Sequence, residues 1–178
     1  MEVQIIETPE GYAAAAWDNG KLAGITLPHD IEQEAVRTLE GYVEASLTPL
    51  SSLSGQADHH RQRLAEDMVR YFSGEAVSFE VPLDWSRITS FRQRVLQVVA
   101  EIPYGQCLSY GEIAKRAGCP RGARAVGGAV GSNPWLLVVP CHRVLAHNRG
   151  LGGFGCGLHW KEKLLITEGI SYKANNDK

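Results

Sequence analysis

Hydrophobic and polar positions alternate differently in the two halves of the chain, and the change falls near residue 86. In the first half, two apolar runs flank an Asp-Asn-Gly sequence at 18–20. Asn-Gly is a preferred pair for a tight turn, so these runs predict a hairpin. Amphipathic stretches at 30–47 and 59–74 predict two helices. The first half, residues 1–86, therefore reads as an α+β domain.

Local signals place the boundaries of these elements. Asp30 precedes the first helical pattern as a candidate N-cap, and Gly74 ends the second. A Ser-rich connector at 48–57 separates the two helices. Residues 76–84, AVSFEVPLD, alternate as in a strand, and Pro82 puts this strand at a sheet edge or at its own end.

The second half, residues 87–172, is a run of short helical patterns. Residues 90–105 are amphipathic, with an apolar stripe made of Phe91, Val95, Leu96, Val98 and Val99. A last helical stretch ends at Gly169, and the tail 173–178 is expected to fray.

Between these helices lies a pattern typical of a helix-turn-helix. Ser109 followed by Glu112 is the signature of a capping box, and Gly118 ends that helix. A short Gly-Cys-Pro turn then leads into a second helix over 121–132. Two short helices joined by so tight a turn predict a helix-turn-helix.

The second helix of that pair is poor in side chains, with small residues at Gly122, Ala123, Ala125, Gly127, Gly128, Ala129 and Gly131. Each interior glycine costs about 1 kcal/mol relative to alanine. Close packing against another helix is one explanation. The other is close approach to a ligand such as the minor groove of DNA, which is only about 6 Å wide. A thin helix would fit there, with Arg124 projecting from it.

Charge changes this picture. The chain has a net charge of −2, but residues 1–86 carry −10 and residues 87–178 carry +8. Glu112 is the only acid close in the sequence to the four cations that cluster near the glycine-rich helix: Lys115, Arg116, Arg121 and Arg124. The asymmetry suggests that the second half faces a polyanion, although charges clustered on solvated faces would produce it too.

Three explanations compete for Cys141, which lies between Pro140 and His142. A free cysteine is most often a buried, inert residue. A zinc ligand is disfavoured because paired ligand spacing is missing around it. A nucleophile needs a lowered pKa or a neighbouring base. His142 would serve as that base only if the chain turns here or a water bridges the two, and Glu168 is the candidate carboxylate for the histidine.

Four stretches together resemble the O6-alkylguanine-DNA alkyltransferases, the methylated-DNA–protein-cysteine methyltransferases. They are PCHRV at 140–144, SYGEIAKRAG at 109–118, RAVGGAVGSNP at 124–134 and KEKLLITEG at 161–169. The match runs from about Phe91 to Gly169. It implies an α+β protein, with an RNase H-like N-terminal domain followed by a mostly helical, winged-helix-like domain that holds the helix-turn-helix.

The resemblance implies a role for each matching position. Cys141 would accept the alkyl group in a single, irreversible turnover, with His142 deprotonating it through a water, Glu168 orienting His142, and Asn133 bracing the turn. Arg124 would fill the place of the flipped base, and Tyr110 would rotate the target phosphate and protonate or hydrogen-bond guanine N3. Other DNA contacts are expected from Ala123, Ala125, Gly127, Arg121, Lys115 and Arg116. The pocket would be formed by Val144, Phe154, Gly155, Cys156 and Lys161.

The pocket departs from the family pattern. Relatives often carry Tyr, Ser and Gly where this chain has Phe154, Gly155 and Cys156. Loss of a serine hydroxyl removes a donor to guanine O6, and Cys156 narrows the entrance against bulky groups such as benzyl. Residues 1–86 contain no cysteine, so the zinc site of some relatives lacks ligands, and His59-His60 fits solvated helix surface.

The expected partner is double-stranded DNA with O6-alkylguanine, with O4-alkylthymine possible, and no cofactor or metal is expected. The chain is expected to be monomeric and away from membranes. Free cysteines and the lack of a secretory signal favour a reducing compartment, the cytoplasm or a eukaryotic nucleus. A thiol hydrolase and a protein that binds alkylated bases without repairing them are the alternatives. Gene regulation usually needs a further metal-binding domain.

Overall fold

The computed structural model describes residues 1–49 and 56–174, with side chains described from residue 59 after the gap. The chain divides into two compact units. The first holds Met1–Arg87 together with Pro134–Val138, and the second holds Ile88–Asn133 and Val139–Lys178. Most of the connector at 48–57, and residues 175–178 of the predicted tail, lie outside the described residues.

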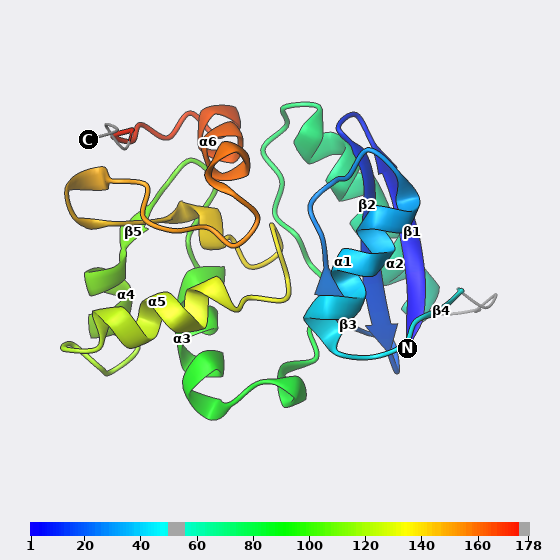
Figure 1. Cartoon of the computed structure of the whole chain (residues 1–178), viewed down its shortest axis with the longest axis horizontal. Coiled ribbons are helices and arrows are strands. Elements are labelled where there is room, and N and C mark those ends of the chain that lie inside the picture. Colours follow the sequence, from blue (N-terminus) through cyan, green and yellow to red (C-terminus); the bar gives the residue numbers. More distant parts are fainter. Residues whose placement is uncertain (50–55, 175–178) are drawn as a thin grey trace. The chain divides into compact units, whose positions relative to one another are not determined.

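A four-stranded sheet with the order β3-β2-β1-β4 forms the centre of the first unit (Figure 1). Its strands are β1 (Glu2–Thr8), β2 (Gly11–Asp18), β3 (Lys21–Ile25) and β4 (Thr48–Pro49). β2 pairs antiparallel with β1 and β3, whereas β4 runs parallel to β1. The predicted hairpin is confirmed: Asn19 and Gly20 both have positive φ, at 49° and 76°, as the tight turn requires.

Two helices cover opposite faces of this sheet because neighbouring residues of β2 point to opposite sides. Helix α1 (Glu32–Val43) packs Ala35, Leu39 and Val43 against Ala14 and Ala16. Helix α2 (Gln56–Phe72) lies on the other face, where the Arg61 guanidinium sits 5.6 Å from the centre of the Trp17 ring. Because Ala14 and Ala16 of β2 have small side chains, α1 can pack closely against the sheet.

Two predicted details of the first unit are wrong. Asp30 does not cap α1; Ile31 occupies the N-cap position without a side-chain bond. The reason is that two backbone hydrogen bonds pair His29 with Tyr12, which holds the chain extended just before the helix. Residues 76–84 form no strand and contribute a single bridge, between Leu83 and Leu22.

The edge of β3 explains the missing strand. Pro82 has no N–H, so residues 82–84 meet Leu22 through only two hydrogen bonds, from the Leu22 N–H to Pro82 and from the Asp84 N–H to Leu22. Further along the same strand, the Ile25 N–H donates to the Pro134 carbonyl. The Trp135 indole N–H also donates to the Leu22 carbonyl, at 2.7 Å. Two distant segments therefore share this edge, and neither forms a full strand.

The second unit is mostly helical. Its helices are α3 (Ser90–Ala100), α4 (Tyr110–Arg116), α5 (Ala123–Gly131) and α6 (Leu158–Thr167). A short parallel pair, β5 (Leu108–Ser109) and β6 (Val144–Leu145), joins them. The core is built from buried apolar side chains, among them Val95, Leu96, Val99, Ile113, Val126 and Val130.

Helices α4 and α5 form the predicted helix-turn-helix, and α5 is shorter than the predicted 121–132. The capping box is present, with Ser109 and Glu112 each bonding the other's backbone. Gly118 follows with a φ of 76° that ends α4. Within the described residues, no helix combines the length and apolarity that a membrane crossing requires.

Candidate active site

The chain turns at Cys141, which meets one of the two alternative conditions under which His142 could assist this cysteine. Cys141 opens a single 3-10 turn, Cys141–Arg143, directly after Pro140. The turn is closed by a hydrogen bond from the Arg143 N–H to the Pro140 carbonyl, at 2.9 Å. Cys141 and His142 are both buried, with exposed fractions of 4% and 1%. Because the backbone is not extended here, the two side chains are not forced to opposite faces.

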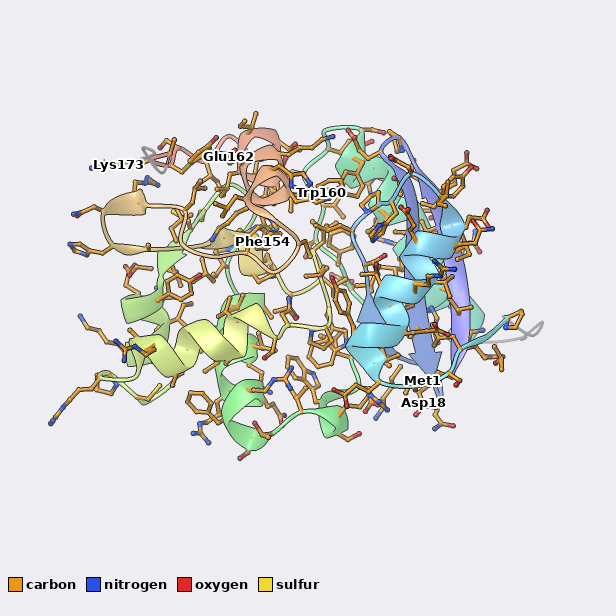
Figure 2. All side chains as sticks on the ribbon, in the orientation of Figure 1. Met1, Asp18, Phe154, Trp160, Glu162 and Lys173 are labelled. Carbon is orange, nitrogen blue, oxygen red and sulfur yellow. The ribbon has the colours of Figure 1, made fainter. Side chains whose placement is uncertain are left out.

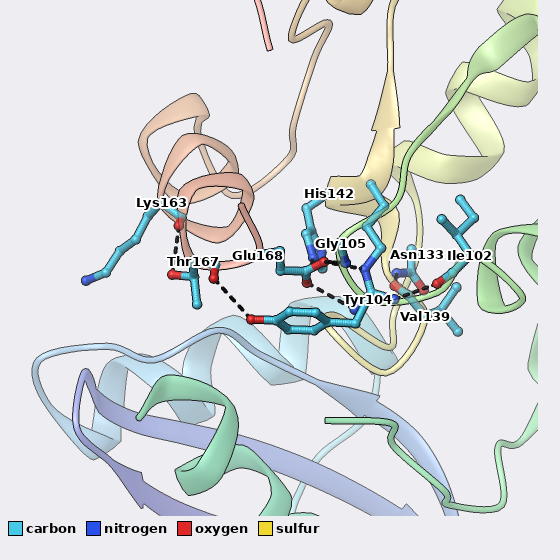
Figure 3. A network of polar contacts seen from close by, with 10 residues as sticks. Ile102, Tyr104, Gly105, Asn133, Val139, His142, Lys163, Thr167 and Glu168 are labelled. Atoms are coloured by element: carbon cyan, nitrogen blue, oxygen red, sulfur yellow. Dashed lines mark hydrogen bonds and ion pairs between the residues drawn. The ribbon is translucent and has the colours of Figure 1, made fainter. Parts of the chain in front are cut away.

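Glu168 meets His142 from the end of α6, where it is the C-cap residue (Figure 3). One carboxylate oxygen lies 2.6 Å from His142 Nε2. The other accepts a hydrogen bond from the Gly105 N–H at 3.2 Å. The second nitrogen of His142, Nδ1, is buried and has no hydrogen-bond partner among the described residues. A neutral imidazole that donates from Nε2 to Glu168 therefore carries its free lone pair on Nδ1.

Sequence reasoning missed Arg143. Its guanidinium binds Glu168 through two nitrogens, Nε at 2.8 Å and Nη2 at 3.0 Å. A third donor, Nη1, reaches the Ile102 carbonyl at 2.6 Å, and the Tyr104 ring lies 5.7 Å from the guanidinium carbon. The sequence held a signal for this pairing. Arg143 directly follows His142, and few acids in this half of the chain are available to pair with a buried arginine.

The pKa values of the site differ from those expected of an activated thiolate. Burial raises the pKa of Cys141 to about 11, although a hydrogen bond with Asn133 and the charge of Lys161 act to lower it. Burial lowers the pKa of His142 against the opposing effect of Glu168. Burial would raise the pKa of Glu168, but bonds from His142 and Arg143 outweigh it and bring that pKa to about 2. At neutral pH the site holds a thiol, a neutral imidazole and a carboxylate.

Asn133 connects the end of α5 to the reactive turn. Its side-chain N–H donates to the Val139 carbonyl at 2.8 Å, and its hydrogen bond with Cys141 lowers the pKa of that thiol. The residue is buried. It therefore fixes the position of the turn relative to the helix-turn-helix.

Lys161 holds the loop that precedes α6. It is fully buried, and its ammonium donates to the carbonyls of Val144 at 2.7 Å, Leu151, and Gly153 at 3.5 Å. Burial lowers the pKa of Lys161 to about 8, while Cys141 acts to raise it. The Val144 carbonyl thus already accepts one hydrogen bond.

The same loop carries the other predicted pocket residues. Figure 2 shows Phe154 on this loop, and its ring centre lies 6.0 Å from the Lys161 ammonium. Phe154 and Cys156 are half-buried and Gly155 is exposed. Cys156 also acts to raise the pKa of Cys141, which places the two sulfur atoms within electrostatic reach of each other.

Tyr110 sits between two glycines. A Cβ at Gly152 would lie 3.1 Å from the ring and 3.3 Å from its hydroxyl, and a Cβ at Gly127 would lie 4.0 Å from the ring. Burial raises the pKa of Tyr110, and the nearby Cys141 raises it further. The phenol is therefore protonated at neutral pH and able to donate a hydrogen bond.

The glycine-rich helix α5 exposes a smooth face. Ala123, Arg124, Ala125, Gly128 and Gly131 are all exposed. A Cβ at Gly128 or Gly131 would meet nothing within 4 Å, so packing within the described chain does not explain these glycines. The cations Lys115, Arg116 and Arg121 are exposed as well.

Other candidate ligands do not gather. Within the part of the chain that the structure describes, no three His, Cys, Asp or Glu side chains lie together as a metal site would need. His59 is exposed and packs edge-on against His60 on α2.

Comparisons with known proteins point to one family. The family model for the DNA-binding domain of 6-O-methylguanine DNA methyltransferase matches residues 90–170. A methylated-DNA–protein-cysteine methyltransferase of Haemophilus influenzae is 49% identical over 104 residues. That match covers 58% of each chain, so this chain spans less than two thirds of the curated relative.

Solved structures extend the likeness over nearly the whole chain. The crystal structure of Mycobacterium tuberculosis O6-methylguanine methyltransferase superposes with a TM-score of 0.71 at 35% identity. The crystal structure of Mycobacterium tuberculosis OGT in complex with DNA gives a TM-score of 0.76 at 34% identity. Both comparisons cover 94% of this chain and 92% of the other.

Proposed function

The chain belongs to the O6-methylguanine-DNA methyltransferase family, and from this premise we propose that it repairs DNA by transferring an alkyl group from guanine O6 to Cys141. The observation that carries the proposal is the buried turn in which Cys141 precedes a histidine bonded to Glu168 at 2.6 Å. The exposed, glycine-rich α5 in the same unit supports a DNA substrate.

The reaction begins with a protonated thiol. A proton leaves Cys141 through a water to Nδ1 of His142, and Glu168 stabilises the imidazolium that forms. The thiolate then attacks the alkyl carbon in line, the bond from that carbon to guanine O6 breaks, and guanine leaves. Protonation of guanine N3 by Tyr110 improves this leaving group. Coupling deprotonation to the reaction suits a thiol whose pKa is near 11.

The product limits the protein to one turnover. Transfer forms a thioether, which lacks the electrophilic carbonyl through which water hydrolyses a thioester. Water therefore does not remove the alkyl group from the sulfur, and each molecule repairs one lesion.

DNA binding follows from the shape of α5. With no side chains at Gly128 and Gly131, its backbone can approach the minor groove closely. Arg124 would take the place of the extruded base, because a target atom inside a stacked duplex is out of reach. Lys115, Arg116 and Arg121 would contact phosphates, with Ala123, Ala125 and Gly127 at the DNA surface.

The remaining details of the proposal are finer. The first unit is RNase H-like and the second winged-helix-like, the protein acts as a monomer, and it works in the cytoplasm or a nucleus. O4-alkylthymine is the second candidate substrate. The Val144 carbonyl, which accepts a hydrogen bond from Lys161, also accepts from the guanine amino group. Cys156, close to the reacting sulfur, disfavours bulky alkyl groups.

Intact-mass measurement after incubation with O6-methylguanine DNA tests the function. We expect the protein to gain the mass of one methyl group, and Cys141→Ala to gain nothing. Unchanged protein that has bound the DNA would favour a reader of alkylated bases. Repeated turnover on esters or peptides would favour a thiol hydrolase. Either result overturns the proposal.

A further inference from the structure

We propose that Arg143 is a positioning residue for this reaction, which fixes the Glu168 carboxylate and supplies the positive charge that keeps His142 free to accept the thiol proton. This inference rests on the proposed function of Cys141. It assigns the buried arginine a role in the pH dependence of alkyl transfer, beyond that of holding the fold together.

The geometry ties Arg143 to the carboxylate rather than to the histidine. Both oxygens of Glu168 are held, Oε2 by Nε at 2.8 Å and Oε1 by Nη2 at 3.0 Å. Oε1 is the same oxygen that lies 2.6 Å from His142 Nε2. Two hydrogen bonds from a planar guanidinium fix both the position and the plane of a carboxylate. Arg143 therefore also sets the orientation in which Glu168 meets the imidazole.

Arg143 is itself anchored on another segment. Its third nitrogen donates to the Ile102 carbonyl at 2.6 Å, and the Tyr104 ring packs 5.7 Å from the guanidinium carbon. Tyr104 in turn donates from its hydroxyl to the Thr167 carbonyl at 3.0 Å, next to Glu168 (Figure 3). The loop after α3 therefore braces the end of α6.

The charges around His142 decide its protonation. Among the described residues, the Glu168 carboxylate favours the imidazolium, whereas burial, Arg143 and Lys161 disfavour it and lower the pKa of His142. Cys141 is adjacent and uncharged at neutral pH, because its own pKa is raised to about 11. Without Arg143, the Glu168 charge would act on His142 uncompensated, and the resting imidazole would hold a proton at higher pH. A protonated imidazole cannot accept the thiol proton.

Two substitutions separate charge from shape. Arg143→Met removes the cation, whereas Arg143→Lys keeps a positive charge without the bidentate geometry. The rate of a single alkyl transfer to O6-methylguanine DNA is measured for each variant between about pH 5.5 and pH 9. We expect the ratio of the rate at high pH to the rate at low pH to rise by about tenfold in Arg143→Met. In Arg143→Lys the whole profile should drop while its midpoint stays near that of the wild type.

A purely structural role would lower the Arg143→Met rate equally at every pH, and that result overturns the inference. If Arg143→Met does not fold, titration of the His142 ring by NMR in the wild type and in Arg143→Lys replaces it. The imidazole should remain neutral below the pH at which free histidine is protonated, and a normal or raised midpoint contradicts the proposal. Wild-type protein that never gains an alkyl group would instead refute the proposed function and leave the titration result standing.

Discussion

At the scale of single residues, the site depends on one buried carboxylate. Glu168 joins His142, Arg143 and the Gly105 N–H, and it keeps its charge because these hydrogen bonds outweigh the effect of burial. Its pKa of about 2 lies below the usual 4.5. The stabilisation from Glu168 is therefore complete above about pH 4.5 and is lost as the pH falls towards 2.

This carboxylate gives a prediction about acid stability. The free energy of unfolding of the wild type should exceed that of Glu168→Gln at neutral pH, and the gap should close by about 3 kcal/mol as the pH falls through that window. Urea unfolding at a series of pH values measures both. Glu75→Gln is the control, because Glu75 pairs with Arg70 at an exposed site. A gap that does not change with pH would show that the charge of Glu168 is not what stabilises the fold.

At the scale of elements, the glycines of α5 lower its stability as a helix but leave part of its exposed face without side chains. Glycine in a helix interior costs about 1 kcal/mol relative to alanine, and open space surrounds Gly128. A larger residue there would fit the free protein and would stand in the way of DNA.

We predict that Gly128→Leu leaves the melting temperature unchanged or raises it, but lowers affinity for duplex DNA by about tenfold or more. Gly41→Leu is a matched control, since Gly41 is also an exposed helix glycine with nothing within 4 Å of a Cβ, but on α1. Thermal unfolding and fluorescence anisotropy report the two effects. Equal affinities for the two variants would contradict the DNA-facing role of α5.

Local signals explain which elements the sequence reveals. Asn19-Gly20 and the Ser109–Glu112 capping box satisfy their own hydrogen bonds within a few residues, so their patterns predict them reliably. The strand predicted at 76–84 does not form because a strand needs a free sheet edge to pair with. The edge of β3 is divided between residues 82–84 and Pro134. The network around Glu168 joins residues about 25 and 40 positions apart. No local pattern encodes such contacts. Cys141, His142 and Glu168 could be proposed as a set from the sequence, but only the family resemblance favoured a nucleophilic cysteine over an inert one. The raised pKa of the thiol depends on its burial, which the structure supplies.

At the scale of the whole molecule, two oppositely charged units form a nearly neutral chain. The first half of the sequence carries −10 and the second +8, and the cations around α5 are exposed. Binding to DNA should therefore weaken with salt, through a small number of phosphate contacts.

We predict that the slope of log affinity against log salt falls in magnitude by about 1 to 2 when Lys115 and Arg116 are both replaced by alanine. Lys21→Ala, an exposed cation of the acidic unit, should leave the slope unchanged. Anisotropy titrations across a range of salt concentrations measure it. Binding that ignores salt would contradict the assignment of these cations to phosphates.

The segment Pro134–Val138 belongs to the first unit although its neighbours in the sequence belong to the second, and this limits how the chain can be shortened. These five residues belong to the first unit, where Trp135 is buried and its indole is tied to Leu22. These five residues follow Asn133 directly and end two positions before Pro140. A hydrogen bond from the Asn133 side chain to the Val139 carbonyl joins the two ends of the segment. Removing residues 1–86 would expose the Trp135 indole, six positions before Cys141 in the sequence. A fragment made from residues 87–178 alone would therefore expose to solvent an apolar side chain that the whole chain buries.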